Sequence, residues 1–342
     1  MSSELWKYCG KQQEKEFLLS LNLLPAGMRE RMSGEAQLAL LYALSNHAER
    51  HYRETRIPKK GGGSRRLLVP DGLLKGVQRN ILHHCLDGRS ISAYACAYRR
   101  GRSPIDNAAP HAGGDKDKLL LKLDIRNFFD SILFLRVYGA AFPESLFPPA
   151  AAGLLTHLCC CYDRLPQGAP TSPAISNLVM RPFDDYIGKW CEARQITYTR
   201  YCDDLAFSGV FDAGEVYRKV RGMLEAMGFT LNPRKTVVAN QGMRQTVTGL
   251  VVNEKVRTSA QYRRKIRQEI YYCRRYGVRE HLKAVGSLSG KETEGEAAAK
   301  EQAFLQSLFG RIAYVLQTEP ENQEFLEYRD GCRSMLLEKE RG

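Results

Sequence analysis

A chain of 342 residues is longer than most single domains, so we expect two or three packed subdomains and exclude a minimal scaffold that needs disulfides or metals to fold. Hydrophobic residues make up 43% of the chain, which is ordinary for a globular protein. Lysine and arginine total 51 against 38 acidic residues, and the net charge of +13 suits a polyanionic partner such as nucleic acid without proving one.

The ten cysteines are interpreted as reduced, buried side chains. The opening residues, MSSELWKYCGKQQEKE, are polar and charged where a secretory signal needs an apolar segment. No C-x-x-C pair or Cys/His ladder with zinc spacing occurs, and Cys159, Cys160 and Cys161 are adjacent, which is poor geometry for one metal ion. Apolar stretches such as 147–155 are interrupted by Pro and Gly and are too short for a bilayer, so we expect no membrane partner.

The first predicted element is a helical region over 35–55, because its apolar residues recur at helical spacing. Glycines 61–63 then predict a hairpin-like turn that leads into a strand over 65–69. Lys59 and Lys60 would lie at the flexible tip of this hairpin.

The middle of the chain combines helical and strand patterns. A helical period covers 73–86, and 92–111 is typical of a loop with a basic turn. The run LLLKLDI at 119–125 is short and apolar, which predicts a buried strand with a polar tip. Two further strands, 196–201 and 205–209, flank a tight acidic turn and form a hairpin.

The rest of the chain begins with a helical pattern over 216–228, closed by a glycine, before strands and turns resume. A basic helix covers 259–276, and 288–301 is a polar loop that enters a last helix. The order strand, helix, hairpin, helix, strand predicts an α+β palm.

Three aspartates are placed to act together. Asp124 lies near the end of one predicted strand, and Asp203 and Asp204 lie at the tip of the hairpin. Nucleotidyl transfer uses two divalent cations about 3.5 to 4 Å apart, which three carboxylates on neighbouring strands can hold and one cannot. Their oxygen ligands suit Mg²⁺. The alternative is that Asp-Asp simply begins a solvated turn.

Four segments in the expected order strengthen the first interpretation. LKLDIRNFFDSI resembles the first catalytic motif of reverse transcriptases, LPQGAPTSPAISN the second, YCDD the third and GFTLNPRKT the fourth. The resemblance covers residues from about 57 to 253 and implies an RNA-directed DNA polymerase with an α+β right-hand fold. Its expected parts are a helical region and fingers over 1–115, a palm over 116–253 that includes part of the fingers at 135–175, and a helical thumb over 254–342.

The resemblance implies a metal and nucleotide site. Two Mg²⁺ ions, with Mn²⁺ as an alternative, would be held by Asp124, Ile125, Asp203 and Asp204. Phe129 matches the aromatic steric gate that selects deoxynucleotides, whereas Phe128 is better explained as a core residue.

The same resemblance assigns residues to the incoming nucleotide. Gln167 and Gly168 would approach it from a Pro/Gly-rich loop. Arg65 would grip its triphosphate, with Arg66 as the nearer rival. Lys235 aligns with the lysine proposed to protonate the leaving pyrophosphate, although a surface lysine without contacts is equally consistent with the sequence.

Two further strings resemble retron reverse transcriptases. Asn107 and His111 belong to an N-A-x-x-H string, and Val247, Thr248 and Gly249 form V-T-G, one before the first catalytic motif and one after the fourth. The family usually has Ala where Cys202 stands, a small-for-small change that leaves the carboxylates intact.

Resemblance to retrons implies a particular biology. The enzyme would bind a structured noncoding RNA encoded beside it, prime from an internal guanosine 2′-hydroxyl, and use dNTPs to make a branched RNA–DNA called msDNA. It would act in the bacterial cytoplasm in defence against phage, together with a separate effector protein encoded nearby.

The basic helix would then be a thumb element that lies on RNA phosphates through one face, which carries Arg264, Arg267, Tyr271 and Arg274. A merely solvated basic face is the alternative. Two other functions stay open: a group II intron-like or diversity-generating reverse transcriptase, and a non-catalytic RNA-binding protein with a degenerate palm.

Overall fold

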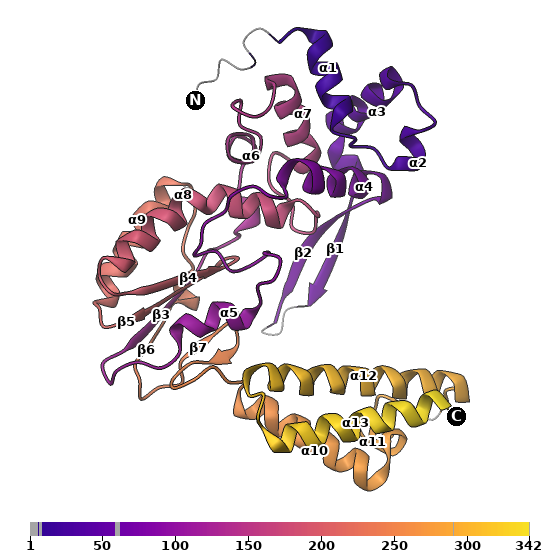
Figure 1. Cartoon of the computed structure of the whole chain (residues 1–342), viewed down its shortest axis with the longest axis vertical. Helices are drawn as coiled ribbons and strands as arrows, with labels where there is room; N and C mark the ends of the chain where they lie inside the picture. The colour runs from indigo at the N-terminus through magenta and orange to yellow at the C-terminus, as the bar shows by residue number, and fades with distance from the viewer. Residues whose placement is uncertain (1–5, 7–8, 59–61, 290, 342) are drawn as a thin grey trace. The chain divides into compact units, whose positions relative to one another are not determined.

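The computed structural model describes residues 6, 9–58, 62–289 and 291–341. Lys59, Lys60 and Gly61 of the predicted hairpin tip lie outside these residues. The chain forms two compact units, each described by itself (Figure 1): unit 1 comprises Met1–Ser103 and Lys118–Val238, and unit 2 comprises Pro104–Asp117 and Ala239–Gly342. The expected three-part division at 115 and 253 remains a prediction.

Unit 1 contains a helical part and a sheet part. Its elements are α1 (Lys11–Ser20), α2 (Ala26–Arg29), α3 (Gly34–Asn46), η1 (Ala48–His51), β1 (Tyr52–Pro58), β2 (Ser64–Pro70), α4 (Gly72–Ile81), η2 (Leu82–Leu86), β3 (Leu119–Asp124), η4 (Phe129–Ser131), α6 (Phe134–Ala141), α7 (Pro149–Cys159), α8 (Ser172–Glu192), β4 (Thr197–Tyr201), β5 (Asp204–Gly209), α9 (Ala213–Ala226), η5 (Pro233–Lys235) and β6 (Val237–Ala239).

The predicted helix over 35–55 was too long. The helix α3 ends at Asn46, and Tyr52–Pro58 is instead strand β1, antiparallel to β2. Tyr, Thr and Ile in the sequence YRETRIP favour a pleated strand. The predicted strand over 65–69 is confirmed within β2.

The central sheet has the strand order β4-β5-β3-β6. Strand β3 pairs antiparallel with β5 from Leu119↔Gly209 to Asp124↔Asp204. Helices α8 and α9 cover one face of this sheet (Figure 1), where Phe183 and Val220 join Phe207 in a single hydrophobic core. An antiparallel sheet packed under helices confirms the expected α+β fold class.

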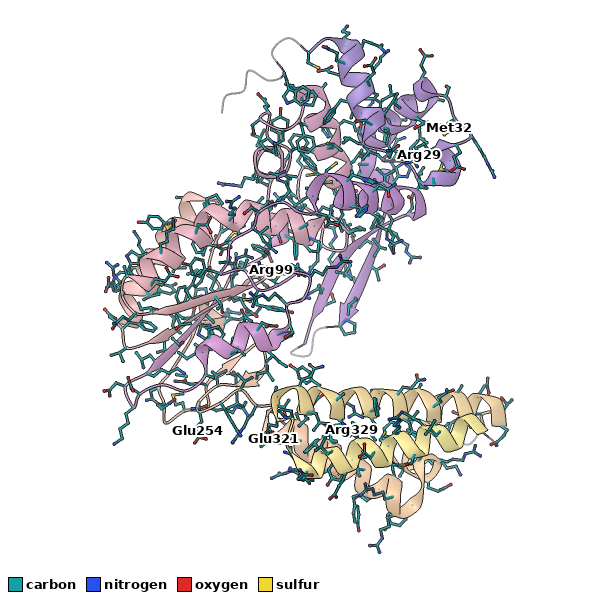
Figure 2. All side chains as sticks on the ribbon, viewed as in Figure 1. Arg29, Met32, Arg99, Glu254, Glu321 and Arg329 are labelled. Atoms are coloured by element: carbon teal, nitrogen blue, oxygen red, sulfur yellow. The ribbon has the colours of Figure 1, made fainter. Side chains whose placement is uncertain are left out.

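Unit 2 contains a small hairpin region and four longer helices. Its elements are α5 (Pro104–Ala108), η3 (Ala109–His111), β7 (Thr246–Val247), β8 (Leu250–Val251), α10 (Ala260–Tyr276), α11 (Val278–Ala284), α12 (Glu294–Thr318) and α13 (Gln323–Arg341). The helical core of this unit includes Ile270, Leu308 and Phe325. Side chains pack around the core of each unit, and Arg329 lies on the last helix (Figure 2).

Local signals set the helix ends in unit 2. The hydroxyl of Ser259 accepts a hydrogen bond from the Tyr262 backbone N–H and caps α10. Gly277, with φ 85°, follows the last residue of this helix and stops it. Thr293 and Glu296 form a capping box that starts α12. The polar loop predicted over 288–301 is only partly right, because α12 begins within it at Glu294. The single last helix is wrong, because α13 follows α12.

The loop predicted over 92–111 is also partly wrong, because α5 and η3 occupy its second half. Gly101 shortly before this helix and Pro104 at its first position are typical of a loop, which hid the short helical turn. Throughout the described ranges, no helix combines the length and apolar character that crossing a membrane requires.

Candidate active site

The Tyr-Cys-Asp-Asp segment forms the expected tight turn between β4 and β5. Tyr201 and Asp204 are register partners, so Cys202 and Asp203 are the two turn residues. Cys202 has φ 60°, in the left-handed region that tight hairpin turns use. The Ile125 backbone N–H donates to the carbonyl of Asp203 at 3.0 Å, which ties the turn to the end of β3.

The structure brings the three predicted carboxylates together. Asp124 ends β3 and is the register partner of Asp204, the first residue of β5, and Asp203 precedes it in the turn. These aspartates, together with Ile125, line one pocket of about 610 Å³. Because the register places Asp124 opposite Asp204, the pairing that the sequence predicted across 80 residues exists in the fold.

A short segment after α9 reaches back to Asp124. The Asn232 backbone N–H donates to the Asp124 carbonyl at 2.8 Å, and its side-chain amide donates to Asp124 Oδ1 at 3.2 Å. One turn later, Lys235 Nζ donates to Asp124 Oδ2 at 2.6 Å. Lys235 is therefore not the isolated surface lysine that the sequence also allowed.

Carboxylate crowding shapes the electrostatics of the site. Desolvation by surrounding protein, followed by the charges of Asp203 and Asp124, raises the pKa of Asp204 to about 6. The hydrogen bond to Asp124 raises the pKa of Lys235, which keeps its ammonium charged. Three carboxylates thus lie close enough together to raise one another's cost of ionisation, which a bound cation would relieve.

The donor chemistry fits a hard divalent cation, since all three side chains offer oxygen. Their present orientation does not form a complete ligand set: within the described parts of the chain, no group of three His, Cys, Asp or Glu side chains is arranged to hold a metal ion. Lys235 and Asn232 occupy both carboxylate oxygens of Asp124. Metal binding by these residues would thus require Asp124 to release at least one of these partners.

Three of the four predicted nucleotide-binding residues line the same pocket, and Gly168 does not. Arg65, Phe129 and Gln167 line it with the aspartates. Arg66 pairs with Glu54 at 2.9 Å, whereas Arg65 has no acidic partner in the described part of the chain. The structure therefore separates the two rivals: Arg65 is the arginine available for a phosphate.

Phe128 and Phe129 differ in burial, as the sequence predicted. Phe128 is 3% exposed and stacks on Phe229 with ring centroids 5.8 Å apart, which confirms it as a core residue. Phe129 is only half-buried and faces the pocket. A ring at this position can contact a bound sugar.

Gly168 allows close backbone contact between the loop that carries Gln167 and the β1–β2 hairpin. The Leu68 backbone N–H donates to the carbonyl of Gln167 at 2.8 Å. Gly168 has φ +126°, and a Cβ there would lie 2.7 Å from the Leu68 carbonyl oxygen. Only glycine fits without displacing this loop, which carries Gln167 into the pocket.

The two retron-like strings lie together in unit 2. Thr248 and Gly249, with φ 47° and 82°, form the turn between β7 and β8, and the Thr248 hydroxyl donates to the Pro104 carbonyl at 2.8 Å. Val247, Asn107 and His111 are 2%, 2% and 0% exposed. Their burial favours a role in shaping this region, and the predicted RNA contacts remain predictions.

The predicted RNA-contacting face of α10 is only partly open. Arg267 donates two 2.6 Å hydrogen bonds to Glu324, and Arg274 stacks over Tyr328 at 5.4 Å, so both are engaged with α13. Arg264 and Tyr271 remain exposed. The acidic and aromatic partners lie more than 50 residues further on, so the periodicity of α10 alone could not reveal them.

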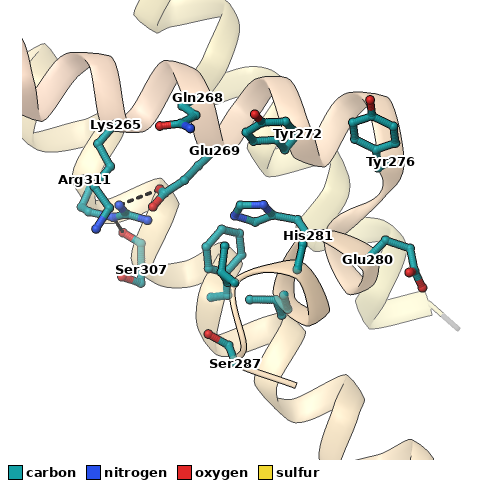
Figure 3. Close-up of a pocket in the computed structure, with 14 residues that line it drawn as sticks. Lys265, Gln268, Glu269, Tyr272, Tyr276, Glu280, His281, Ser287, Ser307 and Arg311 are labelled. Carbon is teal, nitrogen blue, oxygen red and sulfur yellow. Dashed lines mark hydrogen bonds and ion pairs between the residues drawn. The ribbon is translucent and has the colours of Figure 1, made fainter. Parts of the chain in front are cut away.

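A separate hollow of about 1130 Å³ lies within unit 2, between α10, α11 and α12 (Figure 3). Tyr272 stacks on His281 with centroids 5.8 Å apart and on Tyr276 at 6.2 Å. Arg311 pairs with Glu269 at 2.6 Å on the other side. This hollow holds none of the predicted catalytic residues.

Sequence reasoning missed three residues around the catalytic turn. Asn232 was visible within the fourth motif but received no role. Tyr98, whose hydroxyl donates to Cys202 Sγ at 3.1 Å, stands in a predicted loop and carries no sequence signal. Arg200 precedes Tyr201, where a polar residue in a strand is ordinarily expected to face solvent.

Comparison with known proteins agrees with the motifs. The family described as reverse transcriptase (RNA-dependent DNA polymerase) matches residues 57–265. The chain is 32% identical over 301 residues to the retron Mx65 reverse transcriptase of Myxococcus xanthus, covering 82% of this chain and 64% of that protein. It is 31% identical over 271 residues to the retron Ec86 reverse transcriptase of Escherichia coli, covering 77% and 82%.

The chain thus spans slightly less than two thirds of the Mx65 protein and most of the Ec86 protein. Among solved structures, a telomerase from Candida albicans in complex with a telomeric RNA fragment is similar with a TM-score of 0.44 and 12% identity, over 84% of this chain and 63% of that chain.

Proposed function

Because this chain belongs to the retron reverse transcriptases, within the reverse transcriptase (RNA-dependent DNA polymerase) family, we propose that it builds DNA from dNTPs on a structured noncoding RNA. The observation that carries the proposal is the register pairing of Asp124 with Asp204, beside Asp203. Arg65 and Phe129 line the same pocket, as a nucleotide site requires.

A reverse transcriptase domain implies dependence on a divalent metal, and we propose Mg²⁺, with Mn²⁺ as an alternative. The carboxylates of Asp124, Asp203 and Asp204 would hold it, with the backbone carbonyl of Ile125. When bound, such ions neutralise the charge that develops on the transferring phosphoryl group.

Side chains of this protein bind the nucleotide, select its sugar and supply a proton. The Arg65 guanidinium binds triphosphate oxygens, for which its planar fork is well shaped. The Phe129 ring lies under the sugar and excludes a 2′-hydroxyl by steric contact, and Gln167 orients the nucleotide. Lys235, kept protonated by its hydrogen bond to Asp124, supplies a proton to the departing pyrophosphate.

Membership of the retron branch supports the finer proposal. The enzyme would act in the bacterial cytoplasm, prime from an internal 2′-hydroxyl of its own noncoding RNA, and produce msDNA. A separate effector protein encoded nearby would act with this product in defence against phage. This proposal goes beyond the chemistry of the pocket, and its test is the nucleic acid that the protein carries.

Unit 2 offers an exposed aromatic and basic surface for the RNA. Tyr271 and Tyr276 are 52% and 56% exposed, and the guanidinium of Arg275 lies over both rings at 5.9 and 5.6 Å. Unpaired bases stack on such rings while arginine contacts phosphate. We therefore place the RNA contacts of α10 on this surface and on Arg264, rather than on Arg267 and Arg274.

Replacing the aspartates tests the central proposal. Asp203→Asn and Asp204→Asn should each abolish DNA synthesis on primed RNA with Mg²⁺, while RNA affinity stays within about threefold, since neither side chain is a backbone-phosphate contact. Asp185→Asn is a matched control, because Asp185 is an acid that pairs with Arg181 on α8. Retained synthesis in both variants would refute the assignment, and a wild-type protein that binds RNA without synthesis would favour the degenerate-palm alternative.

Sequencing the co-purified nucleic acid after debranching tests the retron assignment. We expect one structured RNA joined to DNA through a 2′-linkage. Random cellular RNA, or an intron or variable-repeat RNA, would instead support a group II intron-like or diversity-generating enzyme.

A further inference from the structure

Arg200 is a fully buried charge directly before the catalytic turn. Its side chain and that of Asp184 are both 0% exposed, and their closest atoms are 2.6 Å apart. A buried ion pair is expensive to desolvate, and well-packed hydrophobic residues often replace one without loss of stability. Its presence one residue before Tyr201 therefore calls for an explanation beyond stability.

All three guanidinium nitrogens of Arg200 have partners. Nε and Nη2 donate to the Asp184 carboxylate, and Nη2 also donates to Asn177 Oδ1 at 3.1 Å. Nη1 points the other way and donates to the backbone carbonyl of Cys202 at 3.0 Å. Arg200 therefore connects helix α8, which covers the sheet (Figure 1), to the turn itself.

This bond fixes one side of Asp203. The Cys202 carbonyl belongs to the peptide unit that precedes Asp203, and Arg200 holds it. The carbonyl of Asp203 belongs to the next peptide unit, and the Ile125 backbone N–H holds it at 3.0 Å. Asp203 is thus tied to the core on one side and to the strand of Asp124 on the other.

The tether is needed because the turn is conformationally demanding. Cys202 is a non-glycine residue at φ 60°, a conformation that persists only where neighbouring contacts enforce it. Without the Arg200 bond, the peptide between Cys202 and Asp203 could rotate and carry the Asp203 carboxylate away from Asp124 and Asp204.

We propose that Arg200 is a positioning residue: its bond to the Cys202 carbonyl orients Asp203, so that this carboxylate meets the metal and the nucleotide together with Asp124 and Asp204. The inference rests on the proposed polymerase function. Asp184 and Asn177 hold the guanidinium in place, and the Arg200–Asp184 pair is fully buried, which strengthens these bonds.

The test compares Arg200→Lys with Tyr198→Phe in the full-length protein. Lysine keeps the charge beside Asp184 but cannot donate to Asp184 and Cys202 in the same geometry. Tyr198→Phe removes the 2.8 Å hydrogen bond from Tyr198 to Asp184 and leaves the Arg200–Cys202 bond in place. Both variants perturb the same buried cluster, but only Arg200→Lys removes the bond to the Cys202 carbonyl. A difference in activity between them therefore reports on the positioning role.

For Arg200→Lys we expect kcat to fall about tenfold to hundredfold, because small displacements of a reacting group have effects of this size. The dNTP KM and the RNA affinity should be nearly unchanged. Mn²⁺ binding, measured by electron paramagnetic resonance without any reaction, should weaken several-fold. Tyr198→Phe should lose a few degrees of Tm and keep wild-type kcat and Mn²⁺ affinity.

Equal losses of Mn²⁺ affinity in both variants would overturn the inference, because general softening of the core would then explain them. Wild-type behaviour of Arg200→Lys would also overturn it. If Arg200→Lys fails to fold, Arg200→Met with Asp184→Leu replaces the pair by apolar side chains, and a folded double variant with wild-type kcat sinks the proposal. Asp203→Asn in the same assay tests the polymerase function separately. It should be inactive, whatever the behaviour of Arg200→Lys.

Discussion

The ammonium of Lys235 lies 2.6 Å from Oδ2 of Asp124, and the two side chains differ sharply in exposure, at 61% and 6%. An exposed ammonium thus pairs with the most buried of the three carboxylates. Lys235 thereby offsets the charge of Asp124 in the free protein, and under the proposed mechanism its ammonium would serve the leaving pyrophosphate.

Lys235→Ala should lower kcat about 10²- to 10⁴-fold, the usual range for loss of a general acid, with RNA affinity retained. Single-nucleotide incorporation under pre-steady-state conditions measures the effect. Lys219→Ala is the control, because Lys219 donates to the Tyr186 hydroxyl on a helix face outside the pocket. Equal rates in the two variants would show that Lys235 only balances charge.

Arg65→Ala should raise the dNTP KM about 10- to 100-fold, since charge-assisted hydrogen bonds to phosphate contribute about 1.5–3 kcal/mol. Arg66→Ala should change it less than about threefold, because Arg66 makes an exposed ion pair with Glu54, which is worth little. Steady-state kinetics on a primed RNA template decides between them. The reverse ranking would move the triphosphate contact to Arg66.

Phe129→Ala should admit ribonucleotides and reduce sugar discrimination at least about tenfold, because the steric contact with a 2′-hydroxyl is removed. Competition between dNTPs and rNTPs during primer extension measures it. Phe128→Leu should instead lower Tm and leave the discrimination intact, since Phe128 packs against Phe229 in the core. Unchanged discrimination in Phe129→Ala would exclude the gate.

Asp204 should make the metal-free protein less stable as pH rises. Its folded-state pKa of about 6 exceeds the ordinary 3.8, so the native state binds this proton more tightly than the unfolded state does. The stability that protonation provides is therefore present below about pH 4 and is lost as pH rises through about 6.

Asp204→Asn removes this titration. The measurement is the free energy of unfolding by denaturant in EDTA. After allowance for solvent screening, the variant should be about 1 kcal/mol more stable than wild type at pH 7.5. At pH 4.5 the two proteins should be nearly equally stable. A constant difference across this range would mean that Asp204 does not carry the charge penalty.

Much of the catalytic centre could be predicted because its signals are local. The strand that ends at Asp124 is a short apolar run, and the acidic turn is bounded by two β-rich segments. The hydrophobic pattern therefore predicts both the strand and the hairpin, and the motifs predict that they pair. Gly168 and Phe129 were likewise found through motifs whose spacing the chain preserves.

The missed features depend on contacts between distant residues. In the sequence, Arg200 cannot be distinguished from an exposed arginine in a strand. Only the fold brings Asp184, from the preceding helix, into contact with it. Arg267 and Glu324 are separated by 57 residues, so the basic stripe on α10 gave no sign that another helix covers part of it. Periodicity identifies a face, whereas the tertiary packing decides what that face meets.

The hydroxyl of Thr248 and the carbonyl of Pro104 join segments that lie 144 residues apart in the sequence. The segment Pro104–Asp117 belongs to unit 2, although both its neighbours in sequence belong to unit 1. A fragment that stops at residue 238 would keep this segment and lose the strands it packs against, leaving Asn107 and His111 uncovered. Dissecting the molecule therefore calls for excision of 104–117 and a new linker from 103 to 118, because serial shortening from the carboxyl end would damage both halves at once.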